Sequence, residues 1–141
     1  MTFDQNSVRS RIRLIAGYLL EMDLLRSMEL EEILDDVFKY RAAERLQELI
    51  IQASIDTNRY ILTGLYDKRT KTNADVFIDA EKVGILPLDL AERLAKASGL
   101  RNFLAHQYEK INPLIVVESI ESICVDFQLY LVCIENYVNS L

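Results

Sequence analysis

Turn-forming residues are scarce in this chain, whose 141 residues include only four glycines and two prolines. Folds made of many short strands need frequent turns, and turns rely on these two residues. Leucine, alanine, glutamate and arginine, which favour helices, are abundant. Half of the residues are hydrophobic, enough for a core without disulfides or metal. We therefore expect one all-α domain over residues 1–141.

Residues that bind transition metals are also rare, because the chain has two cysteines and a single histidine. Cys124 and Cys133 fall on opposite faces of one expected helix, about 13 Å apart along its axis, so they cannot form a disulfide with each other. No set of Asp, Glu, His and Cys has the spacing of metal ligands. We expect neither a metal nor another cofactor.

Long apolar runs are missing as well. No stretch approaches twenty uninterrupted apolar residues, and residues 1–13 mix charged with apolar side chains, unlike a signal peptide. These features disfavour a membrane-spanning or exported protein, so we expect a cytoplasmic location and no membrane partner.

The formal net charge is -6, which disfavours a nucleic-acid partner until the charge is divided along the chain. Residues 1–58 carry 7 basic and 11 acidic groups, residues 59–110 carry 9 and 7, and residues 111–141 carry none and 4. The middle segment thus has a net charge of +2, and phosphate contacts need such a local positive surface. The basic residues that we consider are Lys68, Arg69, Lys71 and Lys110. The loop at 67–73 is equally consistent with an ordinary solvated surface.

Apolar residues at a three-and-four spacing predict helices joined by short loops. The expected ranges are about 7–27, 30–34, 37–66, 73–82, 88–97 and 113–139. An acid at 35–36 can cap the helix 37–66, Asn73 can cap the next helix, and residues 112–113 give an Asn cap followed by Pro. Residues 83–84 are a left-handed helix stop.

Asp56 interrupts the apolar stripe expected on the helix 37–66. That stripe consists of Leu46, Leu49, Ile50, Ala53, Tyr60 and Ile61. A carboxylate on or beside a buried face needs a cation, which Arg59 or Arg101 can supply. Two interpretations stay open: a salt bridge that only orients helices, or a residue that orients Arg101 or His106 for chemistry.

Gly99 is expected to break or bend the helix before residues 101–108. The break would place Arg101 at a helix start, where free backbone N–H groups and the helix dipole favour an anionic ligand. His106 follows five residues later, which is 140° of rotation and about 7.5 Å of rise, so the two side chains would not share a face. The arginine must therefore reach towards the histidine, or another chain must complete the site.

The last helix has an apolar stripe broader than one core face requires. Its members are Ile115, Val116, Ile120, Ile123, Phe127, Tyr130, Leu131, Ile134 and Val138. Such a surface suits a helix that packs inside the domain on one side and against a second subunit on another. A helix central to the bundle is the alternative.

Arginine, histidine and tyrosine occur together in residues 101–108, and they offer a fixed cation, a group that titrates near neutral pH and a phenol. The pattern Arg101-x4-His106-x-Tyr108 resembles the Arg-x4-6-His motif of the HEPN superfamily, in the form with a trailing tyrosine found in HepT toxin ribonucleases. Flanking segments agree in order and spacing, so the similarity covers most of the chain. They are 41–47 (RAAERLQ), 53–56 (ASID), 83–87 (VGILP) and 90–94 (LAERL).

The resemblance implies an up-and-down helical bundle of HEPN type that acts as the endoribonuclease toxin of a type II toxin–antitoxin system. The ribose 2′-hydroxyl of RNA would attack its own phosphodiester without metal. His106 would act as general base or acid and Arg101 would stabilise charge on the phosphate, with Asn102 and Asp56 in support. A homodimer or higher oligomer would supply the second histidine that such cleavage needs.

The resemblance also implies a protein partner, an MntA-like minimal nucleotidyltransferase antitoxin that transfers AMP onto Tyr108. An added phosphate and base would compete for Arg101 and block the path of RNA. Two other functions stay open: a non-catalytic HEPN-like module that binds nucleotide or a nucleotidyltransferase, and a plain dimerising adaptor.

Overall fold

A computed structural model describes residues 3–106 and 112–141, with only the backbone described at 103–106. The described residues form α-helices and contain no strand. The helices are α1 (Gln5–Arg26), α2 (Leu30–Leu34), α3 (Val37–Tyr66), α4 (Asn73–Lys82), α5 (Leu88–His106) and α6 (Pro113–Asn139). The all-α prediction is confirmed.

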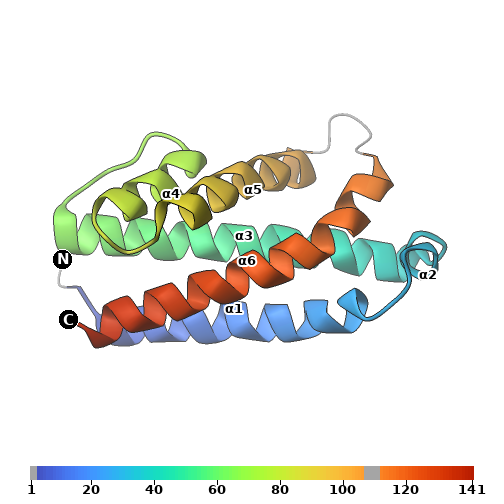
Figure 1. Cartoon of the computed structure of the whole chain (residues 1–141), viewed down its shortest axis with the longest axis horizontal. Helices are drawn as coiled ribbons and strands as arrows, with labels where there is room; N and C mark the ends of the chain where they lie inside the picture. The colour runs from blue at the N-terminus through green and yellow to red at the C-terminus, as the bar shows by residue number, and fades with distance from the viewer. Residues whose placement is uncertain (1–2, 107–111) are drawn as a thin grey trace.

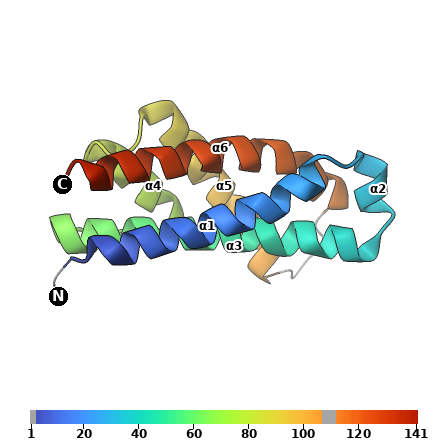
Figure 2. The ribbon, with the colours of Figure 1, turned by 90° about the horizontal axis from the view of Figure 1, so that it is seen from below.

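Three long helices, α1, α3 and α6, run along the length of the molecule and pack against one another (Figure 1). The shorter α4 and α5 pack together and against α3. The short α2 closes one end, where the chain turns from α1 to α3, whereas both termini lie at the opposite end (Figures 1 and 2). The result is an up-and-down bundle with additional short helices.

Local signals account for most helix boundaries. Asp36 caps α3 by accepting hydrogen bonds from the backbone N–H groups of residues 38 and 39, and Asn112 caps α6 before Pro113. Gly84, with φ of +85°, provides the expected left-handed stop after α4. The predicted cap of α4 was wrong by one residue: Thr72 is the cap, and its hydroxyl accepts from the N–H of Asp75.

The expected break at Gly99 does not occur, because α5 continues from Leu88 to His106. Glycine within a helix costs roughly 1 kcal/mol relative to alanine, which packing easily offsets. The first half of α5 packs into the core through buried Leu90, Ala91 and Leu94. This packing fixes the helix axis before Gly99 is reached, so the chain has no reason to turn there.

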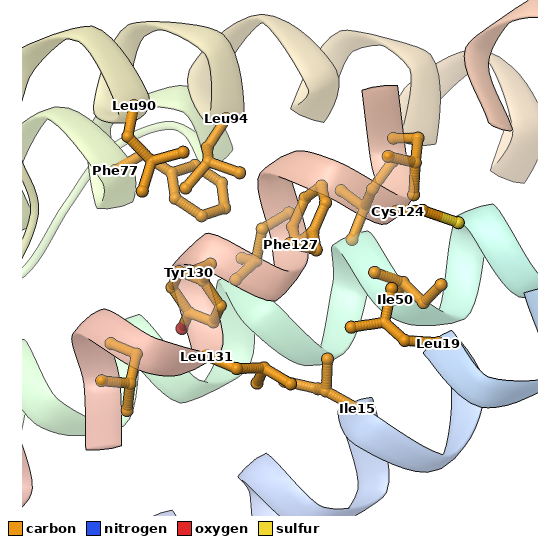
Figure 3. Close-up of a cluster of buried hydrophobic side chains, with 14 of the residues drawn as sticks. Ile15, Leu19, Ile50, Phe77, Leu90, Leu94, Cys124, Phe127, Tyr130 and Leu131 are labelled. Atoms are coloured by element: carbon orange, nitrogen blue, oxygen red, sulfur yellow. The ribbon is translucent and has the colours of Figure 1, made fainter. Parts of the chain in front are cut away.

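The core is built around aromatic residues of α4 and α6 (Figure 3). Phe77 and Phe127 each meet the ring of Tyr130 edge-on, with centroids 6.2 and 6.1 Å away. The Tyr130 hydroxyl donates to Asn58 Oδ1 at 2.7 Å and lies 3.1 Å from the Ser54 carbonyl oxygen. Tyr130 thus makes both apolar ring contacts and hydrogen bonds in the same part of the core.

The buried face of α3 is more polar than its apolar stripe predicted. Ile50 and Ile61 are buried as expected, but the other four expected members are only partly buried. Polar side chains take inward positions instead, namely Gln47, Ser54, Thr57 and Asn58. Their amides bond across the bundle: Gln47 Nε2 donates to the Val116 carbonyl at 2.7 Å and Asn58 Nδ2 to the Val76 carbonyl at 3.2 Å. These contacts fix the register of α3 against α6 and α4.

The last helix is central to the bundle and also presents apolar side chains outward. Its inward residues are buried, whereas Val125, Leu129 and Val132 are 42%, 45% and 54% exposed. Both cysteines are free, as predicted, and burial raises the pKa of the Cys124 thiol to about 11.

Candidate functional site

The last turns of α5 carry the residues that the motif singled out. Arg101 is partly buried and Asn102 is exposed. His106 is the last residue of α5, and its side chain is not among the described atoms. Tyr108 and Lys110 lie outside the described residues. The motif therefore begins on a helix and continues into the connection between α5 and α6.

The continuity of α5 changes the electrostatics expected at Arg101. Its backbone lies within a helix rather than at a helix start, so the expectation of free N–H groups and a positive dipole end beside Arg101 is wrong. The guanidinium itself must supply the positive charge. Its Nε atom is buried and has no hydrogen-bond partner among the described residues. A buried donor of this kind is available to an anionic acceptor.

Arg93 forms one ion pair between α5 and α6 and one within α5. Arg93 Nε donates to Asp126 Oδ1 of α6 at 3.0 Å, and Arg93 Nη1 lies 3.3 Å from Asp89 Oδ2. The bond to Asp126 is the main cause of the raised pKa of Arg93, and the bond from Arg93 lowers the pKa of Asp89. Arg93 thus holds α5 to α6 and contributes little free positive charge.

A groove of about 380 Å³ lies between α5 and α6 beside the motif. Leu100, the residue before Arg101, lines it together with Lys96 and Ile115. Ile115, a member of the broad apolar stripe expected on the last helix, is 50% exposed. The motif therefore adjoins an apolar recess rather than a flat surface.

Asp56 lies elsewhere. It is exposed rather than on a buried face, and Gln52 Nε2 donates to its Oδ1 at 2.8 Å. Within the described part of the chain, no hydrogen bond or ion pair joins Asp56 to Arg101. The sequence placed Asp56 wrongly because the buried face of α3 is shifted from the expected stripe towards residues such as Ser54, Thr57 and Asn58, which leaves Asp56 exposed. Its role in orienting Arg101 or His106 stays a prediction.

Asp56 lines a cleft of about 1000 Å³ at the end of the bundle where the termini lie. Its walls come from the start of the chain, the second half of α3 and the loop after α3. The lining residues that matter here are Phe3, Arg11, Asp56, Arg59, Tyr60 and Arg69. Sequence reasoning missed Arg11, although its three-and-four spacing from Val8 and Ile15 was a signal that it leans towards the core.

The three basic residues of the loop after α3 have different surroundings. Lys68 Nζ lies 3.4 Å from Asp79 Oδ1, so its charge is partly neutralised. Arg69 lines the cleft and is exposed, and Lys71 is exposed. Only the last two are open to a ligand in this arrangement, and RNA contact by any of the three stays a prediction.

Neither a metal cluster nor a membrane span occurs in the part of the chain that the structure describes. No three of its His, Cys, Asp and Glu side chains are placed to hold a metal ion. None of the helices in the described ranges is both long and apolar enough to cross a membrane.

Comparison with known proteins gives one consistent result. The family model described as "Ribonuclease HepT-like" matches residues 10–134. A tRNA nuclease HepT of Aphanizomenon flos-aquae is 35% identical over 134 residues, which cover 95% of this chain and 91% of that protein. A putative RNase of Archaeoglobus fulgidus is 40% identical over 43 residues, covering 30% of this chain and 33% of that protein.

Solved structures share the fold at lower identity. A tri-AMPylated HEPN toxin of Shewanella oneidensis, in complex with MNT antitoxin, superposes with a TM-score of 0.83 at 19% identity, covering 92% of this chain and 96% of that chain. A cytosolic protein of unknown function from Bacillus subtilis, YutE, superposes with a TM-score of 0.85 at 16% identity, covering 99% of this chain and 94% of that chain. These likenesses establish the bundle topology.

Proposed function

The chain belongs to the ribonuclease HepT-like family, and on that premise we propose that it is an RNA endonuclease, the toxin of a toxin–antitoxin pair. The observation that carries the proposal is the intact pair Arg101 and His106 at the end of α5, in a chain that matches the family from residue 10 to residue 134. The relative at 35% identity is a tRNA nuclease. Transfer RNA is therefore the substrate class to test first.

The chemistry of cleavage follows from the residue types of the motif. His106 takes the proton of a ribose 2′-hydroxyl or gives one to the leaving 5′-oxygen, because an imidazole titrates near neutral pH. Arg101 binds the phosphate, and its Nε donor, which has no partner among the described residues, stabilises the charge that develops there. The new bond joins O2′ to phosphorus and the P–O5′ bond breaks, which leaves a 2′,3′-cyclic phosphate. Asn102, exposed one residue after Arg101, supports the substrate.

A homodimer or higher oligomer completes this site. One chain has one histidine, and cleavage uses both a base and an acid. Exposed apolar side chains on α1 and α6, two helices that pack together, offer the contact surface. They are Leu20 at 68%, Leu24 at 67%, Val125 at 42%, Leu129 at 45% and Val132 at 54% exposure.

The partner that restrains the toxin is an MntA-like nucleotidyltransferase. Several structures with this fold are complexes of a toxin with such an antitoxin, and the toxin of one is AMPylated. Tyr108 is the acceptor that the motif provides. Its hydroxyl attacks the α-phosphate of ATP, pyrophosphate leaves, and the bound AMP places a negative charge and a base beside Arg101.

Expression without a partner tests the function. The wild-type chain should stop growth and degrade transfer RNA, whereas His106→Ala should do neither at equal protein level. Full growth and intact RNA with the wild-type chain would refute the proposal.

Co-expression with the antitoxin tests the modification. Intact mass should rise by about 329 Da for each AMP transferred. Tyr108→Phe should stay toxic and resist neutralisation. No adduct, together with full neutralisation of Tyr108→Phe, would show that the antitoxin acts by binding alone.

A further inference from the structure

The cleft at the end of the bundle where the termini lie is lined by charged residues that have no role in the proposed cleavage. Three arginines line it, Arg11 of α1, Arg59 of α3 and Arg69 of the following loop, against the carboxylates of Asp56 and Asp67. The described residues show no ion pair for any of these five charges. Four arginines elsewhere, Arg26, Arg41, Arg45 and Arg93, are ion-paired. The cleft therefore holds a net charge of about +1 that is free to meet an anion.

Arg11 is held in position by aromatic side chains rather than by an acid. Its guanidinium lies 5.0 Å from the centre of the Tyr60 ring, and the Phe3 ring stacks on Tyr60 with centroids 5.5 Å apart. The Tyr60 hydroxyl accepts the backbone N–H of Asp4 at 2.9 Å, which ties the start of α1 to α3. Fixed rings and a fixed guanidinium lose little freedom when a ligand binds.

A glycine makes this arrangement possible. A β-carbon at Gly64 would come within 2.9 Å of Phe3 Cδ2, so any larger residue there would displace the Phe3 ring. The Nε atom of Arg11 is buried and finds no acceptor among the described residues. A donor that is buried, positioned and unpartnered indicates a ligand with acceptor oxygens.

Two different kinds of group thus meet in one cleft. The guanidinium groups suit phosphate, and a base can stack on the outer face of Phe3 or on a guanidinium plane, because Phe3 and Arg11 already cover the Tyr60 ring. Proteins bind single-stranded nucleic acid with this combination. Carboxylates such as Asp56 add acceptors for a ribose 2′-hydroxyl or a base amino group. An acidic peptide would use the arginines but would have no use for the stacked rings.

The cleft is separate from the catalytic motif. Asp56, Arg59 and Tyr60 belong to the last three turns of α3, near the termini, whereas α5 ends over the middle of α3 (Figures 1 and 2). A strand held at the motif can reach the cleft only by running along α3. Such a second contact would select RNA long enough to span both places.

We propose that the cleft between Phe3, Arg11, Arg59, Tyr60 and Arg69 binds a nucleotide unit of single-stranded RNA, as a subsite remote from the cleavage motif. The proposal rests on the proposed ribonuclease function for its biological meaning, but the binding site itself is defined by these residues alone. Because a free nucleotide has the same phosphate and base, the test distinguishes the two sources.

The test measures binding of a fluorescent single-stranded RNA to the full chain carrying His106→Ala, so that RNA is not cut. In that background, Arg69→Gln and Arg11→Gln should each raise the Kd several-fold and lower the slope of log Kd against log salt by about 0.7, the value for one lost phosphate contact on a single strand. Arg13→Gln is the control, because Arg13 lies on α1, is exposed, does not line the cleft, and gives the same charge change. Equal effects of Arg13→Gln and Arg69→Gln would overturn the proposal.

Competition separates the sources of the nucleotide. The proposal expects an RNA oligomer to compete strongly, and ATP or inorganic phosphate to compete weakly. ATP binding that depends on Arg11 and matches RNA in affinity would assign the cleft to a free nucleotide and overturn the RNA assignment. Binding of an acidic peptide in preference to RNA would assign it to a protein partner and also overturn the proposal.

Cleavage kinetics distinguish failure of the subsite from failure of the function. In the active chain, Arg69→Gln should raise KM for a long RNA with little change in kcat, and should not affect a dinucleotide too short to reach the cleft. Unchanged KM in a chain that cleaves RNA refutes the subsite only. Arg11-dependent RNA binding in a chain that cleaves nothing refutes the function and leaves the subsite. Arg69 is on an exposed loop, so its substitution keeps the test valid even if Arg11→Gln weakens the fold.

Discussion

The two ends of the bundle treat their arginines differently. At the end closed by α2, Arg26 forms a two-pronged contact with Glu121 of α6, with distances of 2.6 and 2.7 Å, and Arg41 and Arg45 each pair with a glutamate on α3. At the end with the termini, Arg11, Arg59 and Arg69 line a cleft and have no ion pair among the described residues. Arg26 joins α1 to α6, and Arg41 and Arg45 are neutralised within α3. In the cleft, Arg59 Nη2 donates to Asn73 Oδ1 at 2.9 Å, and the charges of the three cleft arginines are not neutralised by an ion pair among the described residues.

Arg101 belongs with the second group although it lies on another helix. Its Nε atom is buried without a partner among the described residues, as is that of Arg11. A chain with a net charge of -6 can therefore still carry two locally positive places, because its acidic and basic residues are unevenly distributed.

The largest effect is expected at the motif. His106→Ala and Arg101→Ala should each slow RNA cleavage by about a hundredfold or more, because each removes a proton-transfer group or a charge-stabilising donor. Circular dichroism should show both variants folded. Arg45→Gln, which alters an ion-paired arginine at the closed end, should cleave at nearly the wild-type rate. A similar loss with Arg45→Gln would remove the distinction between the two groups of arginines.

A smaller effect is expected from two glycines, one before α5 and one within it. A β-carbon added at Gly99 would meet no atom within 4 Å, so Gly99→Ala should raise the free energy of unfolding by about 0.5–1 kcal/mol and leave cleavage intact. Gly84 has φ of +85°, so Gly84→Ala should lower the free energy of unfolding by about 1 kcal/mol.

Urea denaturation of both variants checks these signs. Loss of activity in a folded Gly99→Ala would mean that the motif needs a helix break during cleavage, and that Arg101 does not supply the positive charge alone.

The smallest effect is expected at the closed end, in the pH dependence of stability. The hydrogen bond from Arg26 lowers the pKa of Glu121, so the ion pair stabilises the fold above the ordinary carboxyl pKa, about 4.3, and this contribution is lost as the pH falls through the lower pKa of the folded state. Glu121→Gln should thus be slightly less stable than wild type at pH 7, with the difference vanishing once the pH has fallen below the lowered pKa of Glu121 in the folded state. RNA binding should not change. A difference that grows on acidification would contradict this role.

Local sequence signals predicted most of the helices, because caps and stops act over a few residues. Asp36, Gly84 and the pair Asn112 and Pro113 each act where expected. The predicted helix break at Gly99 was wrong because the effect of a glycine depends on packing elsewhere in α5, which the local sequence does not reveal. The buried face of α3 was misassigned for a similar reason: Gln47 and Asn58 become inward residues only because carbonyls on other helices accept their bonds.

The candidate functional residues also include one group that the sequence could reveal and one that it could not. The motif Arg101-x4-His106 is contiguous in sequence and was therefore visible. The cleft was not, because Phe3, Arg11, Tyr60 and Arg69 come from three separate segments that only the fold brings together. Asp56 was noticed for the right reason, a charge amid apolar residues, but its surroundings are the exposed cleft rather than the core.

Cleavage of transfer RNA by the purified, partner-free chain in EDTA tests the central claim most directly. The account predicts that the wild-type protein cuts without added metal, leaves a 2′,3′-cyclic phosphate on the upstream fragment, and that His106→Ala does not cut. Activity that disappears in EDTA and returns with Mg²⁺, or fragments that carry only a 5′-phosphate and a free 3′-hydroxyl, would contradict it.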